Sequence, residues 1–342
     1  MRSLPLVLYG GFVELCRLNI RTVMRSILLA KKLGLVYTVC VMKCNLCPRK
    51  CNIDRTVSHG FCGVGNVTVS RVAPHMWEEP PISGTKGSGT VFFAGCNLRC
   101  RFCQNYDITV TPHGTELSVE RLADLFVYLC DSGIANINLV TAAQFSDKVA
   151  AALTLCKHRL TLPIVYNTSS YETVNALQRL DGLVDVYLPD VKFCDSALSA
   201  AFARAPDYFT VATAAIAEMK RQQPVNTYDS DGYITSGLIL RHLVLPGHVE
   251  DTKRVLDWIA DFDKSACVSL MSQYFVARHD DKYPELNRKL YKREYAAAVD
   301  YFYNVGLTNG FCQDVSSATR DYLPAFDDVA VDELLQSVPK IF

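Results

Sequence analysis

One short run governs the interpretation of this chain: Cys96-Asn97-Leu98-Arg99-Cys100-Arg101-Phe102-Cys103. Its cysteines have the spacing Cys-x3-Cys-x2-Cys, so three thiolates can bind three irons of a cubane [4Fe-4S] cluster. Electron-transfer clusters of this type ordinarily have four thiolate ligands. A missing fourth ligand leaves one iron open to a small molecule, which favours a loop that takes part in chemistry.

Thiols at this spacing could also belong to a zinc site, to a disulfide pair with a spare thiol, or to three cysteines packed in a core. Structural zinc usually takes four ligands in paired groups. Cysteines this close together would be strained as neighbouring disulfides, and the chain has no secretory features. The cluster loop is therefore the favoured interpretation.

The aromatic Phe102, directly before the last cysteine, completes a likeness to a known family. The run resembles the cluster loop of the radical S-adenosylmethionine (SAM) superfamily. This resemblance implies that Cys96, Cys100 and Cys103 hold a [4Fe-4S] cluster and that SAM binds its open iron. It also implies an oxidoreductase in which an external donor, flavodoxin or ferredoxin-like, reduces the cluster and SAM is cleaved to a 5′-deoxyadenosyl radical.

Length and composition set outer limits. The chain has 342 residues, of which 49% are hydrophobic, enough for one large α/β domain and a small appendage. Lys plus Arg and Asp plus Glu both number 35, so no overall charge points to nucleic acid as a partner. No apolar run approaches the roughly 20 residues of a membrane span. We expect a cytoplasmic protein with neither partner.

The first 43 residues differ from the rest in charge. Seven Arg and Lys residues stand against one acid, Glu14. A targeting peptide is one interpretation of such a profile. Apolar residues from Leu18 to Leu33 recur near helical spacing, which favours a basic helical extension over residues 1–43.

A second cysteine group, Cys44, Cys47, Cys51 and Cys62, lies in a turn-rich stretch. Four soft ligands there predict a metal-binding module over residues 44–85. Zinc and a second [4Fe-4S] cluster both accept four thiolates, and metal-free cysteines remain a further alternative. A zinc ribbon for nucleic acid is disfavoured, because the stretch lacks a basic and aromatic stripe. We expect this module to act separately from the cluster loop.

From Thr90 onward, short apolar runs alternate with amphipathic stretches, the pattern of repeated βα units. Six strands are expected, at 90–94, 136–140, 163–167, 185–188, 238–244 and 268–271. Helices are expected at about 118–131, 146–158, 171–180, 196–220, 250–262 and 293–305. The pattern predicts an α/β fold with an incomplete barrel, and the resemblance implies a partial (β/α)6 TIM-like barrel of the radical SAM type with a small N-terminal Cys-rich metal module. The radical SAM core domain is expected over residues 86–280, and a C-terminal helical segment is expected over residues 281–342.

Active sites in such folds lie at the carboxyl ends of the strands. Two strand ends here resemble SAM-binding segments of the enzymes that activate glycyl-radical proteins. Asp190-Val191-Lys192 matches their Asp-x-Lys motif, which implies contacts to the ammonium and carboxylate of SAM; a surface ion pair is the alternative. Arg241, five residues before Pro246-Gly247, resembles the arginine that closes the SAM pocket with a two-pronged contact to a carboxylate. A structural arginine is the alternative for that position.

Other strand ends depart from these relatives. Thr141-Ala142-Ala143-Gln144 stands where they usually have Gly-Gly-Glu, and Asn167 and Tyr274 replace an acid and an adenine-contacting histidine. Tyr274 stacks on SAM or simply packs in the core. Further upstream, His75, Glu78 and Glu79 either line the site or are solvated. The cofactor contacts that the resemblance implies are Phe102, Gln104, Thr141, Gln144, Asn167, Asp190, Lys192, Arg241 and Tyr274.

The motifs resemble most the pyruvate formate-lyase-activating-enzyme-like branch of the superfamily. That branch has Cys-Pro-Arg-x-Cys, Glu-Glu-Pro, Cys-Gln-Asn and Met-x-Gln-Tyr, all present in this chain. Activation of a glycyl-radical protein is the first function that the resemblance implies, with a protein as substrate. Radical modification of a small molecule or peptide is the second, and a non-catalytic Fe-S or zinc scaffold is the third.

Overall fold

The computed structural model describes residues 13–14, 37–38, 43–313 and 328–342. The basic helical extension predicted over residues 1–43 lies almost wholly outside these residues. Within it, β1 (Val13–Glu14) and β2 (Tyr37–Thr38) form a small parallel pair. None of the helices among the described residues is long and apolar enough to cross a membrane.

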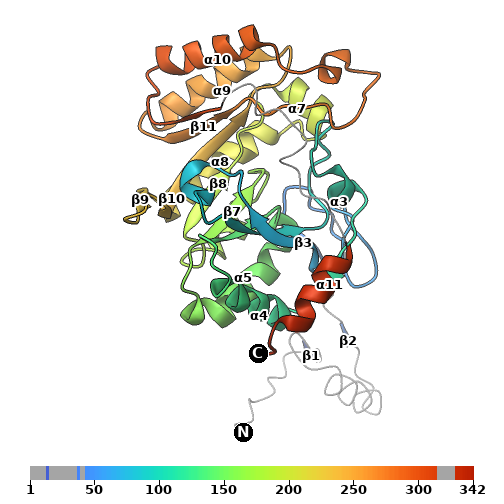
Figure 1. Ribbon diagram of the computed structural model, residues 1–342. Helices are drawn as coiled ribbons and strands as arrows, with labels where there is room; N and C mark the ends of the chain where they lie inside the picture. The colour runs from blue at the N-terminus through green and yellow to red at the C-terminus, as the bar shows by residue number, and fades with distance from the viewer. Residues whose placement is uncertain (1–12, 15–36, 39–42, 314–327) are drawn as a thin grey trace.

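A mixed sheet forms the centre of the molecule (Figure 1). Its middle consists of parallel strands in chain order, each followed by a helical connection. These strands are β4 (Ser88–Phe93), β6 (Ile137–Val140), β7 (Ile164–Thr168), β8 (Val186–Pro189), β10 (Ile234–Leu243) and β11 (Cys267–Met271). All six predicted strands are therefore found, with boundaries shifted by a few residues at most.

Short strands extend both edges of the sheet. On one edge, β12 (Gly310–Cys312) pairs parallel with β11, and β9 (Thr227–Tyr228) pairs antiparallel with β10. On the other edge, β3 (Thr68–His75) and β5 (Thr115–Glu116) run antiparallel. The strand order begins at β12 and ends at β5, so the barrel is open, as the sequence predicted.

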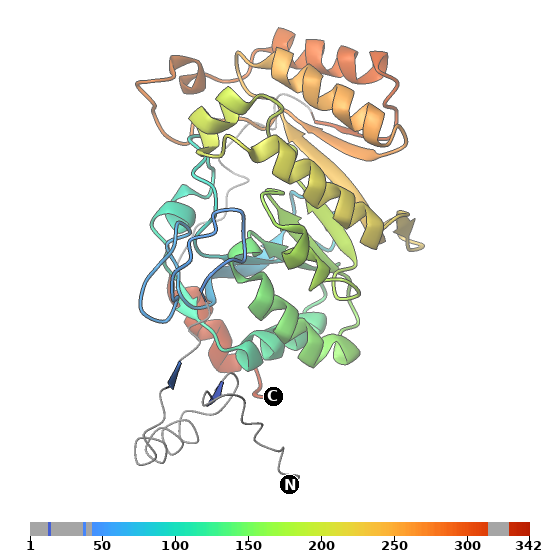
Figure 2. The same cartoon turned by 180° about the vertical axis from the view of Figure 1, so that it is seen from behind.

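Helices cover the sheet between the strands (Figures 1 and 2). They are α4 (Val119–Cys130), α5 (Ser146–Cys156), α6 (Val174–Gln178), α7 (Ser196–Ala203), α8 (Tyr208–Gln222), α9 (Val249–Phe262) and α10 (Lys292–Asn304). Shorter pieces are α2 (Pro80–Ser83), α3 (Tyr106–Val110) and three 3-10 turns, η1 (Ala143–Phe145), η2 (Lys157–Arg159) and η3 (Pro284–Asn287).

One of the predicted helices is divided into two in the structure. The expected helix at 196–220 breaks between α7 and α8, where Arg204 adopts a left-handed φ of 55°. Pro206 follows two residues later and disfavours helical backbone at Ala205. The alanine-rich composition of this stretch had hidden the break, because alanine favours helix throughout.

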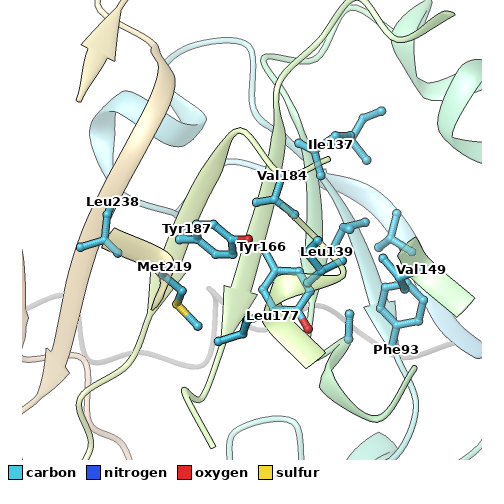
Figure 3. Close-up of a cluster of buried hydrophobic side chains, with 14 of the residues drawn as sticks. Phe93, Ile137, Leu139, Val149, Tyr166, Leu177, Val184, Tyr187, Met219 and Leu238 are labelled. Carbon is cyan, nitrogen blue, oxygen red and sulfur yellow. The ribbon is translucent and has the colours of Figure 1, made fainter. Parts of the chain in front are cut away.

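The core lies between the parallel strands and their helices. Every residue of β4 and of β7 is buried, as expected for strands covered on both faces. In Figure 3 the rings of Tyr166 and Tyr187 meet edge to face, with centroids 6.0 Å apart, among the aliphatic side chains of the core. Each aliphatic side chain buried there contributes roughly 1.5–3 kcal/mol.

The C-terminal helix α11 (Asp328–Ser337) packs on β3, at the antiparallel edge of the sheet (Figure 1). Arg121 donates to the carbonyl of Leu335 over 2.9 Å, and the backbone N–H of Ile341 donates to Asp124 over 2.8 Å. A covered edge is protected from pairing with another chain. This C-terminal segment therefore covers the open barrel on the side of β3 and β5.

Candidate functional site

A cavity of about 230 Å³ opens at the carboxyl ends of the parallel strands. The three cysteines of the cluster loop, Cys96, Cys100 and Cys103, line it together, as the strand-end rule predicts. Of the cysteines in the described residues, these three alone line the cavity. Predicted cofactor contacts that also line it are Phe102, Gln104, Thr141, Asn167, Asp190, Lys192 and Arg241.

The cluster loop leaves β4 through Gly95. Its φ is 74°, and a Cβ there would lie 2.5 Å from the carbonyl oxygen of Cys62, so glycine is required on both counts. The backbone N–H of Leu98 then turns back to the Cys96 Sγ atom over 3.4 Å. The Cys103 Sγ atom lies 3.4 Å from the hydroxyl of Thr109 in the following helix α3.

The cysteines of the loop are desolvated. Burial raises the pKa of Cys96 to about 11, and burial also raises the pKa values of Cys100 and Cys103; neighbouring thiolates add repulsion at Cys96 and Cys100. The charge of Lys192 opposes this rise at all three sites. Three soft donors gathered in one cavity fit an Fe-S cluster, because bound metal takes up thiolate and removes the cost of charge there.

An ion pair stands beside the thiols. Lys192 Nζ donates to Asp190 over 2.5 Å, and Arg241 Nε donates to the other oxygen of the same carboxylate over 2.9 Å. Burial alone would raise the pKa of Asp190, but the Arg241 and Lys192 charges outweigh it and lower that pKa. The Asp-x-Lys pair is therefore ionised at the cavity wall, and it is not a surface pair.

Arg241 is held on three sides. Beside its contact to Asp190, its Nη1 atom lies 3.2 Å from Glu78, and its Nη2 atom donates to the Asn167 amide oxygen over 2.6 Å. The expected fork toward a ligand carboxylate is thus largely engaged by protein groups. Arg241 still lines the cavity, and it also fixes the orientation of its neighbours.

Glu78 completes this network. Its carboxylate accepts from the amides of Asn138 and Asn167, over 3.3 and 3.2 Å. Burial raises the pKa of Glu78 in spite of the nearby Arg241 charge. The sequence offered Glu78 only as a residue that lines the site or is solvated; the Glu-Glu-Pro motif was the available signal. His75 lines the cavity as well, whereas Glu79 is buried behind it.

Two predicted cofactor contacts have other partners. The Gln144 side-chain amide donates to the carbonyls of Ala94 and Gly95, over 2.9 and 3.1 Å, and so braces the start of the cluster loop. Tyr274 is buried, its hydroxyl donates to the carbonyl of Leu286 over 2.6 Å, and its ring lies 6.5 Å from that of Phe102.

The remaining cavity contacts are polar strand-end groups. Thr141 lines the cavity with a left-handed φ of 61°, and its N–H donates to the Asn167 carbonyl over 3.0 Å. Gln104 donates to the carbonyl of Gln273 over 3.1 Å, which ties the cluster loop to the end of β11. These contacts join the strand ends into one continuous wall.

The second cysteine group lies on turns next to the cluster loop. Cys47 and Cys62 are buried, and Cys44 and Cys51 are partly exposed. Burial, together with the charges of the other three thiols, raises the pKa of Cys47 to about 11. No set of three or more His, Cys, Asp or Glu side chains in the described ranges already has the geometry to chelate a metal ion.

This chain is similar to several known proteins. The radical SAM superfamily pattern matches residues 90–259. An uncharacterised protein of Methanocaldococcus jannaschii is 29% identical over 265 residues, 75% of this chain and 73% of that protein. Among solved structures, methylornithine synthase is 15% identical over 73% of this chain and 81% of its own, with a TM-score of 0.44. A domain of a pyruvate-formate lyase-activating enzyme from Bacteroides vulgatus is 13% identical over 49% and 91%, with a TM-score of 0.34. The cluster loop, its place at the strand ends and the matched pattern together show that this chain belongs to the radical SAM superfamily.

Proposed function

We propose that this radical SAM enzyme binds a [4Fe-4S] cluster through Cys96, Cys100 and Cys103 and cleaves SAM reductively. The observation that carries the proposal is the convergence of these three cysteines with a largely buried Asp-Lys pair in one cavity. Three thiolates leave one iron for a ligand. When bound, the reduced cluster and SAM supply a 5′-deoxyadenosyl radical.

The chain's own residues bind and orient the ligand. Asp190 and Lys192 present opposite charges, which match the ammonium and the carboxylate of an amino acid. Phe102 packs edge-on against Phe193, with ring centroids 6.0 Å apart, and supplies an apolar wall beside the thiols. Such a wall limits water near the reacting atoms, which is the protein's usual part in cofactor chemistry.

We propose activation of a glycyl-radical protein as the reaction, with that protein as substrate. The support is the resemblance of the Asp190-x-Lys192 and Arg241 segments to those of the activating enzymes. A reductant of the flavodoxin or ferredoxin class would supply the electron, and the cytoplasm, where thiols stay reduced, is the proposed location. Radical modification of a small molecule or peptide would use the same site.

We propose further that Cys44, Cys47, Cys51 and Cys62 hold a second metal centre, either one zinc ion or a second [4Fe-4S] cluster. Their nearness is the support, since the charge of each of the other three acts on Cys47. Both kinds of centre accept four thiolates.

Anaerobic reconstitution with iron and sulfide, followed by dithionite and SAM, tests these proposals. We expect 5′-deoxyadenosine, with about four irons and one zinc per chain or about eight irons. The variant Cys103→Ala is the control, and it should form no 5′-deoxyadenosine. A fully loaded wild-type cluster that cleaves no SAM, with or without candidate glycyl-radical proteins, would favour a non-catalytic scaffold.

A further inference from the structure

The Cys-rich segment, defined here as residues 44–64, lacks a fold of its own. Within these described residues there is neither helix nor strand, and Val57 is 80% exposed. Its four cysteines are free thiols. Segments that cannot build a core normally need a disulfide or a metal to hold one shape. A bound metal is therefore expected to set the conformation of this segment.

The backbone turns that bring the thiols together are specific. Lys50 and Asn52 have left-handed φ values of 43° and 53°. The backbone N–H of Cys44 donates to the carbonyl of Ile53 over 2.8 Å, and the backbone N–H of Asn52 donates to the carbonyl of Cys44 over 3.0 Å. A Cβ at position 60 would lie 3.0 Å from the Cys51 Sγ atom, so Gly60 leaves room for that thiol.

An arginine from this segment reaches the cluster loop. Arg49, between Cys47 and Cys51, donates from Nε to the carbonyl of Asn97 over 2.7 Å. Asn97 directly follows the cluster cysteine Cys96. The same guanidinium lies 3.9 Å from the centroid of the Phe61 ring. The position of the cluster loop thus depends on a side chain between two cysteines of the other group.

The cluster loop sends an arginine in the opposite direction. Arg99, between Cys96 and Cys100, donates to the carbonyl of Phe61, next to Cys62. Its guanidinium also lies 4.7 Å from the Phe61 ring centroid, and its Nη1 atom donates to the Cys96 carbonyl over 2.6 Å. We call Arg49, Phe61 and Arg99 the arginine clasp. Each cysteine group thereby holds the backbone of the other.

Further contacts attach the Cys-rich segment to neighbouring strand ends. Arg55 donates to the Gln144 carbonyl over 2.5 Å, on the turn after β6. Thr173, after β7, donates from its hydroxyl to the Leu46 carbonyl over 3.2 Å. The segment is therefore fixed relative to the strand ends that carry the cavity.

We infer that the second metal centre positions the SAM cluster loop through the arginine clasp. The inference rests on the second metal centre proposed above and assigns a structural role to that centre. Metal at the four thiols fixes Arg49 and Phe61, and these fix the backbone next to Cys96 and Cys100. The two cysteine groups then act as one unit, contrary to the separate modules expected from sequence.

The variant Arg49→Ala tests the clasp while it keeps all seven thiols of the two groups. We expect unchanged zinc or iron at the second centre, and SAM bound at least about tenfold more weakly, because charge-assisted hydrogen bonds to the loop are lost. SAM affinity is measured by equilibrium dialysis, and loop geometry by the EPR spectrum of the reduced cluster. Arg49→Lys, which keeps the charge without the fork, should restore only part of the affinity.

The variant Cys51→Ala tests the metal. We expect the loss of one zinc or of four irons per chain, and the same weakening of SAM binding as in Arg49→Ala. Lys50→Asn is the matched control, since Lys50 is exposed and asparagine tolerates its left-handed backbone. That control should match wild type in metal content, SAM affinity and EPR spectrum.

Three outcomes would overturn the inference. One is a wild-type chain with no metal beyond the SAM cluster. Another is a Cys51→Ala protein that loses its metal yet binds SAM as wild type does. If Cys51→Ala does not fold, unchanged SAM affinity and EPR spectrum in Arg49→Ala overturn it instead. A failure of SAM cleavage in wild type is a different result, because metal content and SAM affinity are measured without turnover.

Discussion

The two cysteine groups have different supports. The cluster loop follows a buried strand and faces a cavity whose wall carries Asp190 and Lys192. The Cys-rich segment has no helix or strand and reaches the barrel through arginines. Under the proposed assignments, a loop that the barrel holds would leave one metal position open, whereas a segment without a core would use all four thiolates to hold its shape. The two groups would then bind metal for different purposes, chemistry in one and conformation in the other.

The largest effect should come from Cys100→Ala. Only two thiolates would remain for the cluster, so we expect 5′-deoxyadenosine to fall to the level without enzyme. Because the substitution removes one thiol and no metal is present in either protein, far-UV circular dichroism and the melting temperature of the metal-free variant should differ little from those of the metal-free wild type. Cys130→Ala, at the end of α4, is the control and should keep full activity. SAM cleavage by Cys100→Ala would refute the cluster assignment.

The charged side chains Asp190, Lys192 and Arg241 line the cavity beside the cluster loop. The variant Asp190→Asn tests how much their ion pairs contribute to stability. The change leaves two largely buried cations, Lys192 and Arg241, with an amide in place of their shared carboxylate. Breaking a buried pair in this way costs about 3–5 kcal/mol of the free energy of unfolding, measured by urea titration. Asp231→Asn breaks an exposed pair with Lys86 and should cost at most about 1 kcal/mol. Equal losses of the free energy of unfolding in the two variants would show that the Asp190 ion pairs contribute no more to stability than an exposed pair does.

A buried acid behind the cavity predicts a pH dependence of stability. Burial raises the pKa of Glu172 from 4.5 to about 7, against hydrogen bonds from Thr168 and Tyr166. The folded state holds this proton more tightly than the unfolded chain, so its stabilising effect is complete below about pH 4.5. It is lost as the pH rises to about 7, by about 3 kcal/mol in all.

Glu172→Gln checks this prediction, because the glutamine amide, like the protonated acid, has one oxygen that accepts and one group that donates, and it does not titrate. Urea unfolding of the variant should vary less between pH 5 and pH 7 than that of wild type. An identical pH profile in the two proteins would mean that another group is responsible.

The smallest effect is expected at Tyr274, for which the sequence left open a contact with SAM or a place in the core, and which is buried in the structure. Tyr274→Phe removes only the hydroxyl that bonds the Leu286 carbonyl. We expect a loss of about 1 kcal/mol in the free energy of unfolding and unchanged SAM affinity. A loss of affinity at unchanged stability would instead place that hydroxyl at the ligand.

Sequence was sufficient for the barrel strands and for the residues at their ends. Strands such as β4 and β7 are buried on both faces, so each appears as a continuous apolar run. Asp190 and Lys192 follow such a run directly, which places them at the cavity. Short edge strands such as β12 carry no comparable signal, since three residues cannot show a period.

The long-range contacts had no sequence signature. Arg49 and Arg99 look like ordinary charged residues of two loops, and their contacts join positions 48 and 38 residues apart. The engagement of Arg241 by Glu78 spans 163 residues, so only the folded barrel brings the two together. Local pattern identifies which residues lie at strand ends, but the partner of each is decided by tertiary structure.

The early end of α7 bears on the order in which this protein matures. Backbone carbonyls at the end of that helix accept the N–H groups of Arg99 and Arg101, over 3.2 and 2.8 Å, and Asp280 binds the Arg101 side chain over 2.6 Å. During synthesis, the cluster cysteines leave the ribosome well before these partners exist, and contacts of such separation form late. The loop can therefore take its final shape only after most of the chain has been translated. If the loop binds a cluster as proposed, we expect iron delivery to follow translation, and a chain truncated before residue 280 would carry its cysteines without the contacts that shape the loop.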